Sequence, residues 1–150
     1  MQIITNLSKS RSHLTAINSI LEGANDIVIC SGWMRMCGLN AILPAIDIAL
    51  AKGAQISVYT NAKHTDAGCV EALRGRPSLT HFNMVKPYLH TKLYYGRMGE
   101  SFVAMVGSAN ITSGGLWKNE ELSQLVSAVV SDPIHAHYMN YIEKLTRLTA

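Results

Sequence analysis

The sequence predicts an α/β fold in which a mixed β-sheet, parallel in its first half and antiparallel in its second, is flanked by helices on both faces. Runs of β-branched residues alternate with helical patterns through the first half of the chain. In the second half, two β-prone runs separated by a short glycine-containing stretch fit an antiparallel hairpin. The 150 residues are 48% hydrophobic and 15% charged, and no linker divides them, so we expect a single domain over 1–150 with a sizeable core.

The first half follows the order of a β-α-β crossover. The expected elements are a helix that ends at Gly23, a strand over 26–30, a loop over 33–40, a helix over 41–52 and a strand over 55–60. Ser8 or Ser10 is the candidate cap of the first helix. Pro44 falls in the first turn of the second helix, and Gly53 follows its end. The first strand contains a short β-branched run, which is typical of a central strand buried on both faces.

The second half predicts an antiparallel region closed by a helix. The expected elements are a short helix from a cap at Asp66 to Leu73, a strand over 79–84, hairpin strands over 89–95 and 101–106, a strand over 122–130 and a helix that ends at Leu148. The segment 96–100 is the expected hairpin loop. Asp132 and Pro133 form a cap and first-turn pair for the closing helix.

Charge, cysteine content and hydropathy narrow the class of protein. A net charge of +3 permits phosphate binding but does not by itself indicate a nucleic-acid partner. Cys30, Cys37 and Cys69 match no paired metal spacing, so we expect free thiols. No apolar run approaches the roughly 20 residues of a membrane helix, and the first residues lack a secretory signal. We therefore expect a cytoplasmic protein without membrane association.

Polar residues of catalytic type recur in apolar surroundings between 90 and 121. Side chains two residues apart on a strand share a face, so His90 and Lys92 should project together. Histidine can act as nucleophile or as acid and base near neutral pH, and a neighbouring ammonium can hold a phosphate. Ser108 and Asn110 would add neutral hydrogen bonds to phosphate oxygens. Each residue alone fits an ordinary strand or turn, but together they predict phosphoryl-transfer chemistry.

The pattern His-x-Lys, Gly-Ser-x-Asn and Asn-x-Glu resembles the catalytic motif of the phospholipase D superfamily, whose members cleave phosphodiesters in lipids or nucleic acids. The run 107–116 is especially similar to nuclease and restriction-endonuclease members. The resemblance implies that His90 attacks phosphorus to form a phosphohistidine. It also implies that Lys92 and Asn110 bind the phosphate oxygens and that Ser108 supports the pocket.

The same resemblance implies an acid that orients the histidine. Glu121 matches that position, and Glu120 is the competing choice. The family motif also places an aspartate five residues after the lysine, where this chain has Arg97, a candidate contact for substrate phosphate. Family members use two His-x-Lys motifs and this chain has one, so the resemblance implies a two-fold homodimer with a shared site. It requires no metal and no other cofactor.

Further residues are candidates for substrate binding. Trp33 and Arg35 occupy the loop after the first strand, where α/β folds commonly place ligand-contacting groups. Trp33 could instead cover the sheet edge or the dimer seam. Ser113, within the nuclease-like run, is a further candidate. Possible additional phosphate contacts are Lys63, His64 and Lys86.

The remaining histidines and acids predict no second site. His135 and His137 are two residues apart on the expected helix and do not share a face, so we expect ordinary surface residues. His13, His64 and His81 stand singly, and structural or solvated roles are commoner for such histidines. The acidic residues are scattered, without the carboxylate cluster that a two-metal nuclease needs.

The function that these patterns favour is a metal-independent phosphodiesterase acting on nucleic acid, most simply a DNA endonuclease that works as a homodimer. One alternative is a phospholipase or phosphatidyl transferase that uses the same histidine and lysine. Another is a catalytically inactive phospholipase D-like binding module, which the arginine in place of the family aspartate motivates.

Overall fold

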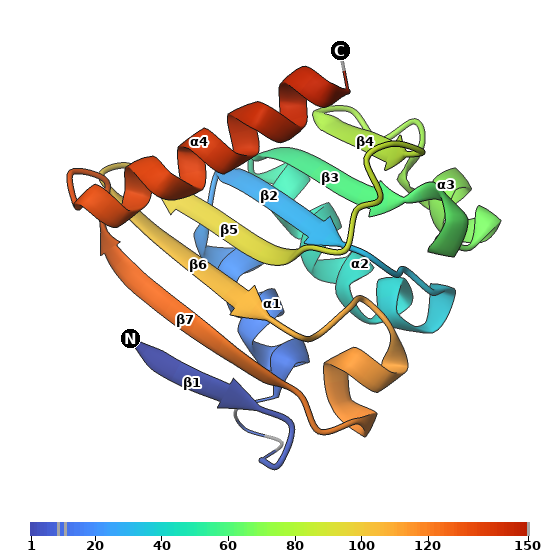
Figure 1. Ribbon diagram of the computed structural model, residues 1–150, viewed down its shortest axis with the longest axis horizontal. Helices are drawn as coiled ribbons and strands as arrows, with labels where there is room; N and C mark the ends of the chain where they lie inside the picture. Colours follow the sequence, from blue (N-terminus) through green and yellow to red (C-terminus); the bar gives the residue numbers. More distant parts are fainter. Residues whose placement is uncertain (9, 11, 150) are drawn as a thin grey trace.

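Figure 1 shows the computed structural model of the chain, which describes residues 1–8, 10 and 12–149. Its described strands form a seven-stranded sheet in the order β1-β7-β6-β5-β2-β3-β4. The strands are β1 (Gln2–Thr5), β2 (Asp26–Ser31), β3 (Gln55–Asn61), β4 (Leu79–Met84), β5 (Lys92–Met98), β6 (Ser101–Gly107) and β7 (Leu122–Val129). The helices are α1 (His13–Gly23), α2 (Met36–Ala51), α3 (Ala67–Leu73) and α4 (Pro133–Leu148), with the short turns η2 (Ala62–His64) and η3 (Gly114–Lys118).

The sheet is mixed, as predicted. Strands β2, β3 and β4 are parallel, whereas β5 pairs antiparallel with β2. Strands β6, β7 and β1 continue the sheet in antiparallel fashion beyond β5. The crossover from β2 through α2 to β3 and the hairpin of β5 and β6 are therefore both confirmed.

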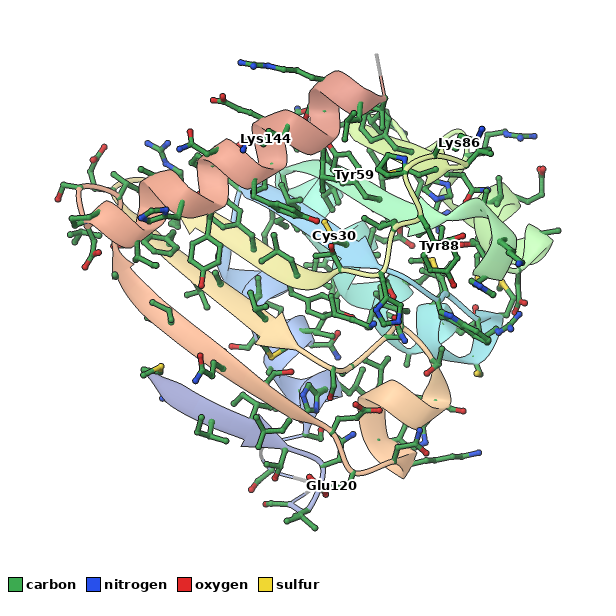
Figure 2. The ribbon with its side chains drawn as sticks, viewed as in Figure 1. Cys30, Tyr59, Lys86, Tyr88, Glu120 and Lys144 are labelled. Atoms are coloured by element: carbon green, nitrogen blue, oxygen red, sulfur yellow. The ribbon has the colours of Figure 1, made fainter. Side chains whose placement is uncertain are left out.

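Helices cover both faces of the sheet. In Figure 1, α4 crosses one face, and α1 and α2 lie behind the sheet. Ile27 and Ile29 of β2 belong to the apolar layer that α1 and α2 share. Cys30 of β2 and Tyr59 of β3 belong to the other layer, beneath α4, where Figure 2 labels both. Strand β2 is thus buried on both faces, as its β-branched run predicts.

The start of α1 differs from the prediction. Its N-cap is Ser12, whose hydroxyl accepts a hydrogen bond from the N–H of Thr15 at 3.3 Å. Ser8 and Ser10 therefore precede the helix without capping it. Several serines lie close together here, and only the one three residues before the donating N–H has the capping geometry.

The start of α2 also differs. The helix begins at Met36, so 36–40 is helical rather than a loop and Pro44 lies inside the helix. The carboxylate of Asp66 accepts a hydrogen bond from the N–H of Met36 at 3.1 Å, while the N–H of Arg35 donates to a carbonyl of the 107–113 loop. Distant segments thus satisfy the first turn, which is why local sequence does not mark it. Asp66 precedes α3 without a side-chain capping hydrogen bond to that helix.

Strand β1 was not predicted, and the hairpin is shifted along the chain. The four residues of β1 pair with β7 at the edge of the sheet. Strand β5 runs to Met98, and Gly99 makes the turn with a φ of 57°. Gly96 lies within β5 because α1 packs closely on it. A Cβ there would lie 2.7 Å from the Cβ of Ala24. This glycine marks a close helix contact and not a loop.

Helix α4 begins as predicted, with Asp132 at the N-cap accepting a hydrogen bond from the main chain two residues later at 3.0 Å. His135, expected at the surface, is buried. Its Nε2 is hydrogen-bonded to the hydroxyl of Tyr95 at 2.8 Å, and its ring centroid lies 4.7 Å from that of Phe102. No helix in the described part of the chain has the length and apolarity needed to span a bilayer.

Candidate active site

The termini of four strands, β2, β5, β6 and β7, lie together at one end of the sheet. Strand β2 ends at Ser31, which pairs with Lys92 at the start of β5. Strand β6 ends at Gly107, which pairs with Ser123 near the start of β7. Antiparallel pairing therefore gathers the segments around 90, 108 and 121, although they are separated along the chain.

His90 and Lys92 project together, as predicted. His90 lies in the exposed segment before β5 rather than on the strand, and the buried side chain of Asn61 donates to the preceding carbonyl at 3.0 Å. Lys92 Nζ lies 3.2 Å from each ring nitrogen of His90 and donates to the His90 carbonyl at 2.8 Å. Lys92 is 8% exposed. The pair thus combines an accessible imidazole with a sheltered ammonium.

The surroundings of Lys92 affect its protonation. Burial lowers the pKa of Lys92 because it penalises the ammonium, and the negative charge of Glu121 opposes this effect. A sheltered ammonium attracts an anion more strongly than an exposed one, since less water lies between the charges. The pair can therefore hold a phosphate beside the imidazole.

Ser108 connects Glu121 to the start of β7. Its hydroxyl accepts a hydrogen bond from the N–H of Leu122 at 3.1 Å and donates one to the carboxylate of Glu121. Within the described residues, the hydrogen bond of Glu121 goes to Ser108 and not to His90. Glu120 is exposed and lies at the lower margin of the molecule in Figure 2. Of the two candidate acids, Glu121 lies beside Ser108 and Lys92.

Asn110 sits in a loop that is fastened to the end of β2. Its Oδ1 accepts a hydrogen bond from the N–H of Trp33 at 3.0 Å. The hydroxyl of Ser31 accepts from the N–H of Ile111 at 2.9 Å, and Tyr94 donates to the carbonyl that precedes Asn110 at 2.7 Å. Because Oδ1 is occupied, the side-chain NH₂ is the part of this amide that can donate to a ligand.

Glycines of the motif allow main-chain segments to approach closely. A Cβ on Gly107 would lie 2.4 Å from the carbonyl oxygen of Leu122. A Cβ on Gly115 would lie 2.2 Å from the carbonyl oxygen of Asn110. Backbone atoms cannot move aside cheaply, so packing requires glycine at both positions.

Trp33 and Arg35 follow β2 at the rim of the site. The guanidinium carbon of Arg35 lies 4.9 Å from the ring centroid of Trp33. Arg35 also forms an ion pair with Asp66 at 2.7 Å. The structure therefore brings both predicted residues to the same end of the sheet as Asn110.

The other two predicted binding residues lie elsewhere. Ser113 forms a hydrogen bond with Cys37 at the start of α2, and this bond lowers the pKa of the thiol. Arg97 lies near the far end of β5, where its Nε donates to the carbonyl of Gly99 at 2.8 Å. The structure does not bring Arg97 to His90, so we leave it out of the site.

A buried network beneath the site was not predicted. His13 is fully buried, with Nε2 hydrogen-bonded to Ser123 at 2.8 Å and Nδ1 to Asn6 at 2.9 Å. Asn6 also donates to the carbonyls of Gly115 and Asn119, at 2.9 and 2.8 Å. Burial lowers the pKa of His13, which favours the neutral ring. His13 and Ser123 are 110 residues apart, so no local pattern reveals the contact.

The groups around His90 suit an anionic ligand. They are the Lys92 ammonium and the Asn110 amide, which can donate hydrogen bonds to oxygen, whereas the Ser108 hydroxyl already donates to Glu121. The described residues contain no group of three or more His, Cys, Asp or Glu side chains that could hold a metal ion. The arrangement can therefore place a phosphate next to an imidazole nucleophile.

Comparisons with known proteins bear on the fold and the family of the chain. A family model described as "Cardiolipin synthase, PLD-like domain" matches residues 16–146. NucT from Helicobacter pylori has a similar structure, with a TM-score of 0.76 at 15% identity over 97% of this chain and 94% of that one. Nuc from Salmonella typhimurium, a phospholipase D family member, gives 0.73 at 14% identity over 97% and 93%. A mutant of yeast tyrosyl-DNA phosphodiesterase gives 0.59 at 13% identity over 95% and 36%.

Among curated protein sequences, none matches the chain significantly. The solved structures are too distant in sequence to show more than the fold. The family model, however, spans most of the sequence, including the His-x-Lys and Gly-Ser-x-Asn motifs. The chain therefore belongs to the phospholipase D-like domain family.

Proposed function

We propose that the protein is a metal-independent phosphodiesterase that cleaves DNA as an endonuclease. The observation that carries this proposal is the contact of Lys92 Nζ with the ring of His90 at 3.2 Å, at the end of the sheet that also bears Asn110. The name of the yeast tyrosyl-DNA phosphodiesterase supports a DNA phosphodiester as substrate. The net charge of +3 also favours a polyanion.

In the proposed reaction, a ring nitrogen of His90 attacks phosphorus. The P–N bond forms as the P–O bond to the leaving oxygen breaks. Lys92 and the NH₂ of Asn110 hold the remaining phosphate oxygens and disperse their charge. Water then attacks the phosphohistidine, which releases the phosphate monoester and restores the imidazole.

The leaving oxygen needs a proton, which one copy of the motif does not supply. We infer a two-fold homodimer in which His90 of the partner subunit acts as general acid and later as base for the water. The exposure of His90 supports this arrangement because a second copy can approach it.

The test is cleavage of a DNA substrate in excess EDTA. We expect the purified protein to cleave, and His90→Ala to reduce the rate at least about 10³-fold, because removal of a nucleophile removes the pathway. Thermal unfolding of the variant should resemble that of the parent, since His90 lies outside the core. Cleavage that requires added Mg²⁺, or that survives the substitution, would contradict the mechanism.

A lipid phosphodiester is the second candidate, because the family model is named for cardiolipin synthase. Vesicles of phosphatidylglycerol and cardiolipin test it directly. Lipid turnover without DNA cleavage would replace the DNA substrate while keeping His90 as nucleophile. An inactive binding module would turn over neither substrate and would yield no phosphohistidine on acid-free trapping.

A further inference from the structure

A row of ring-bearing side chains in contact, with His64 and Tyr88 meeting edge to face, leads to His90 from the loop after β2. Trp33 stacks on His64, with ring centroids 4.2 Å apart and planes inclined by 6°. His64 Nε2 is hydrogen-bonded to the hydroxyl of Tyr88 at 2.7 Å. The ring of Tyr88 lies 6.4 Å from that of His90, at an inclination of 26°. We call Trp33, His64 and Tyr88 the aromatic row.

The aromatic row is anchored at its far end. Arg35 lies over the ring of Trp33 at 4.9 Å and is held by the carboxylate of Asp66 at 2.7 Å. Trp33 is further fixed through its main-chain N–H, which donates a hydrogen bond to Asn110. Trp33 and His64 therefore position the row, and Tyr88 is the ring at its open end.

Tyr88 combines a fixed position with high exposure. Its side chain is 57% exposed, although its hydroxyl is tied to His64. Figure 2 labels Tyr88 and Lys86 on the segment between β4 and β5. An aromatic ring held in place before binding loses little conformational entropy when a ligand stacks on it. Tyr88 thus offers a prepared apolar surface beside the nucleophile.

The charge around the aromatic row suits a polyanionic ligand. Three segments surround the aromatic row: the one after β2, the one after β3, and the one from the end of β4 to the start of β5. Their cationic side chains are Arg35, Lys63, Lys86 and Lys92. Their one acid, Asp66, is paired with Arg35. A nucleic-acid strand would supply the opposite charge to these cations.

Building on the proposed function, we propose that Tyr88 stacks an unpaired nucleobase next to the phosphate held at His90. The substrate is then single-stranded nucleic acid, because bases in a duplex are already paired and stacked on their neighbours. Stacking on aromatic rings is a general way to bind single strands and tolerates any base. The preference therefore concerns strandedness and not sequence.

The test compares cleavage of three substrates in EDTA: a single-stranded oligonucleotide, the same strand with abasic residues, and the corresponding duplex. We expect kcat/KM to be about tenfold higher for the single strand than for either other substrate. Tyr88→Leu should bring the ratio of base-bearing to abasic cleavage close to one. Tyr88→Phe should largely keep that ratio, because it retains the ring.

Trp117→Leu provides the matched control, since Trp117 is 39% exposed but lies on η3, outside the aromatic row. A ratio that persists in Tyr88→Leu would overturn the inference. A change from dimer to monomer when Tyr88→Leu is examined by sedimentation would also overturn it, because Tyr88 would then be a contact between copies. Equal cleavage of the single-stranded and abasic substrates leaves the phosphodiesterase intact and removes only the stacking role. No cleavage of any substrate removes the proposed function itself.

Discussion

At the scale of single residues, Lys92 must remain charged to hold a phosphate, yet it is nearly buried. Burial lowers the pKa of Lys92, and the neighbouring carboxylate of Glu121 counteracts the change. The charge of Glu121 therefore acts on Lys92, because it keeps the ammonium protonated to higher pH. Glu120, which is exposed, has no such position.

Glu121→Gln should shift the alkaline limb of the pH–rate profile to lower pH. Removing a negative charge near an ammonium lowers the pKa of Lys92 further, so Lys92 loses its proton earlier as pH rises. The measurement is kcat/KM across the alkaline range. Glu120→Gln is the matched control and should leave the limb in place. A shift in Glu120→Gln alone would reverse the assignment of the two acids.

At the scale of elements, the 107–121 loop is held from two sides. Strand β2 fastens it through Ser31, and the residue after β1 reaches its far end through Asn6. His13 of α1 binds Ser123 of β7, directly beyond the loop. Elements from the N-terminal part of the chain thus fix the donors that would face a phosphate.

His13→Ala should destabilise the protein by about 1–3 kcal/mol, because it leaves the buried Ser123 hydroxyl without this partner and removes the ring's hydrogen bond to Asn6, which keeps the one from the main chain. We also expect a lower kcat, since the loop loses an anchor. Urea unfolding and steady-state kinetics measure the two effects. His137→Ala, at an exposed position of α4, should change neither. Equal effects of both substitutions would argue against a specific role of the network.

Sequence patterns predicted elements well where the determining contacts are local. The cap at Asp132 and the β-branched run of β2 are examples, and both are present. Prediction failed where contacts between residues far apart in the sequence determine the structure. The first turn of α2 is satisfied by Asp66, and Gly96 is required by α1 packing on β5.

The same distinction applies to the site. His90 and Lys92 are two residues apart, so local spacing predicts their contact, although His90 lies just before β5 and not on the strand. His13 and Tyr88 gain their positions from partners far along the chain. No spacing rule within one sequence could have revealed them.

At the scale of the whole molecule, the proposed site needs two copies of the chain. Mixing parent protein with an equal amount of His90→Ala and allowing subunit exchange should leave about a quarter of the parent activity per total protein, because each active site would need both histidines. Independent sites would leave about half. The measurement is the initial rate in EDTA, with parent alone at the same total concentration as reference. A residual rate of half would show that each active site needs only one His90.

The contacts that hold the 107–121 loop also affect how far the chain can be shortened from its N-terminus. The family model begins its match at residue 16, yet Asn6 and His13 precede that point. A recombinant fragment trimmed to the matched region would keep every motif residue while losing the strand that borders β7, both hydrogen bonds from Asn6 to the loop and the one from His13 to Ser123. The functional boundary of the domain therefore lies upstream of the boundary that sequence similarity marks.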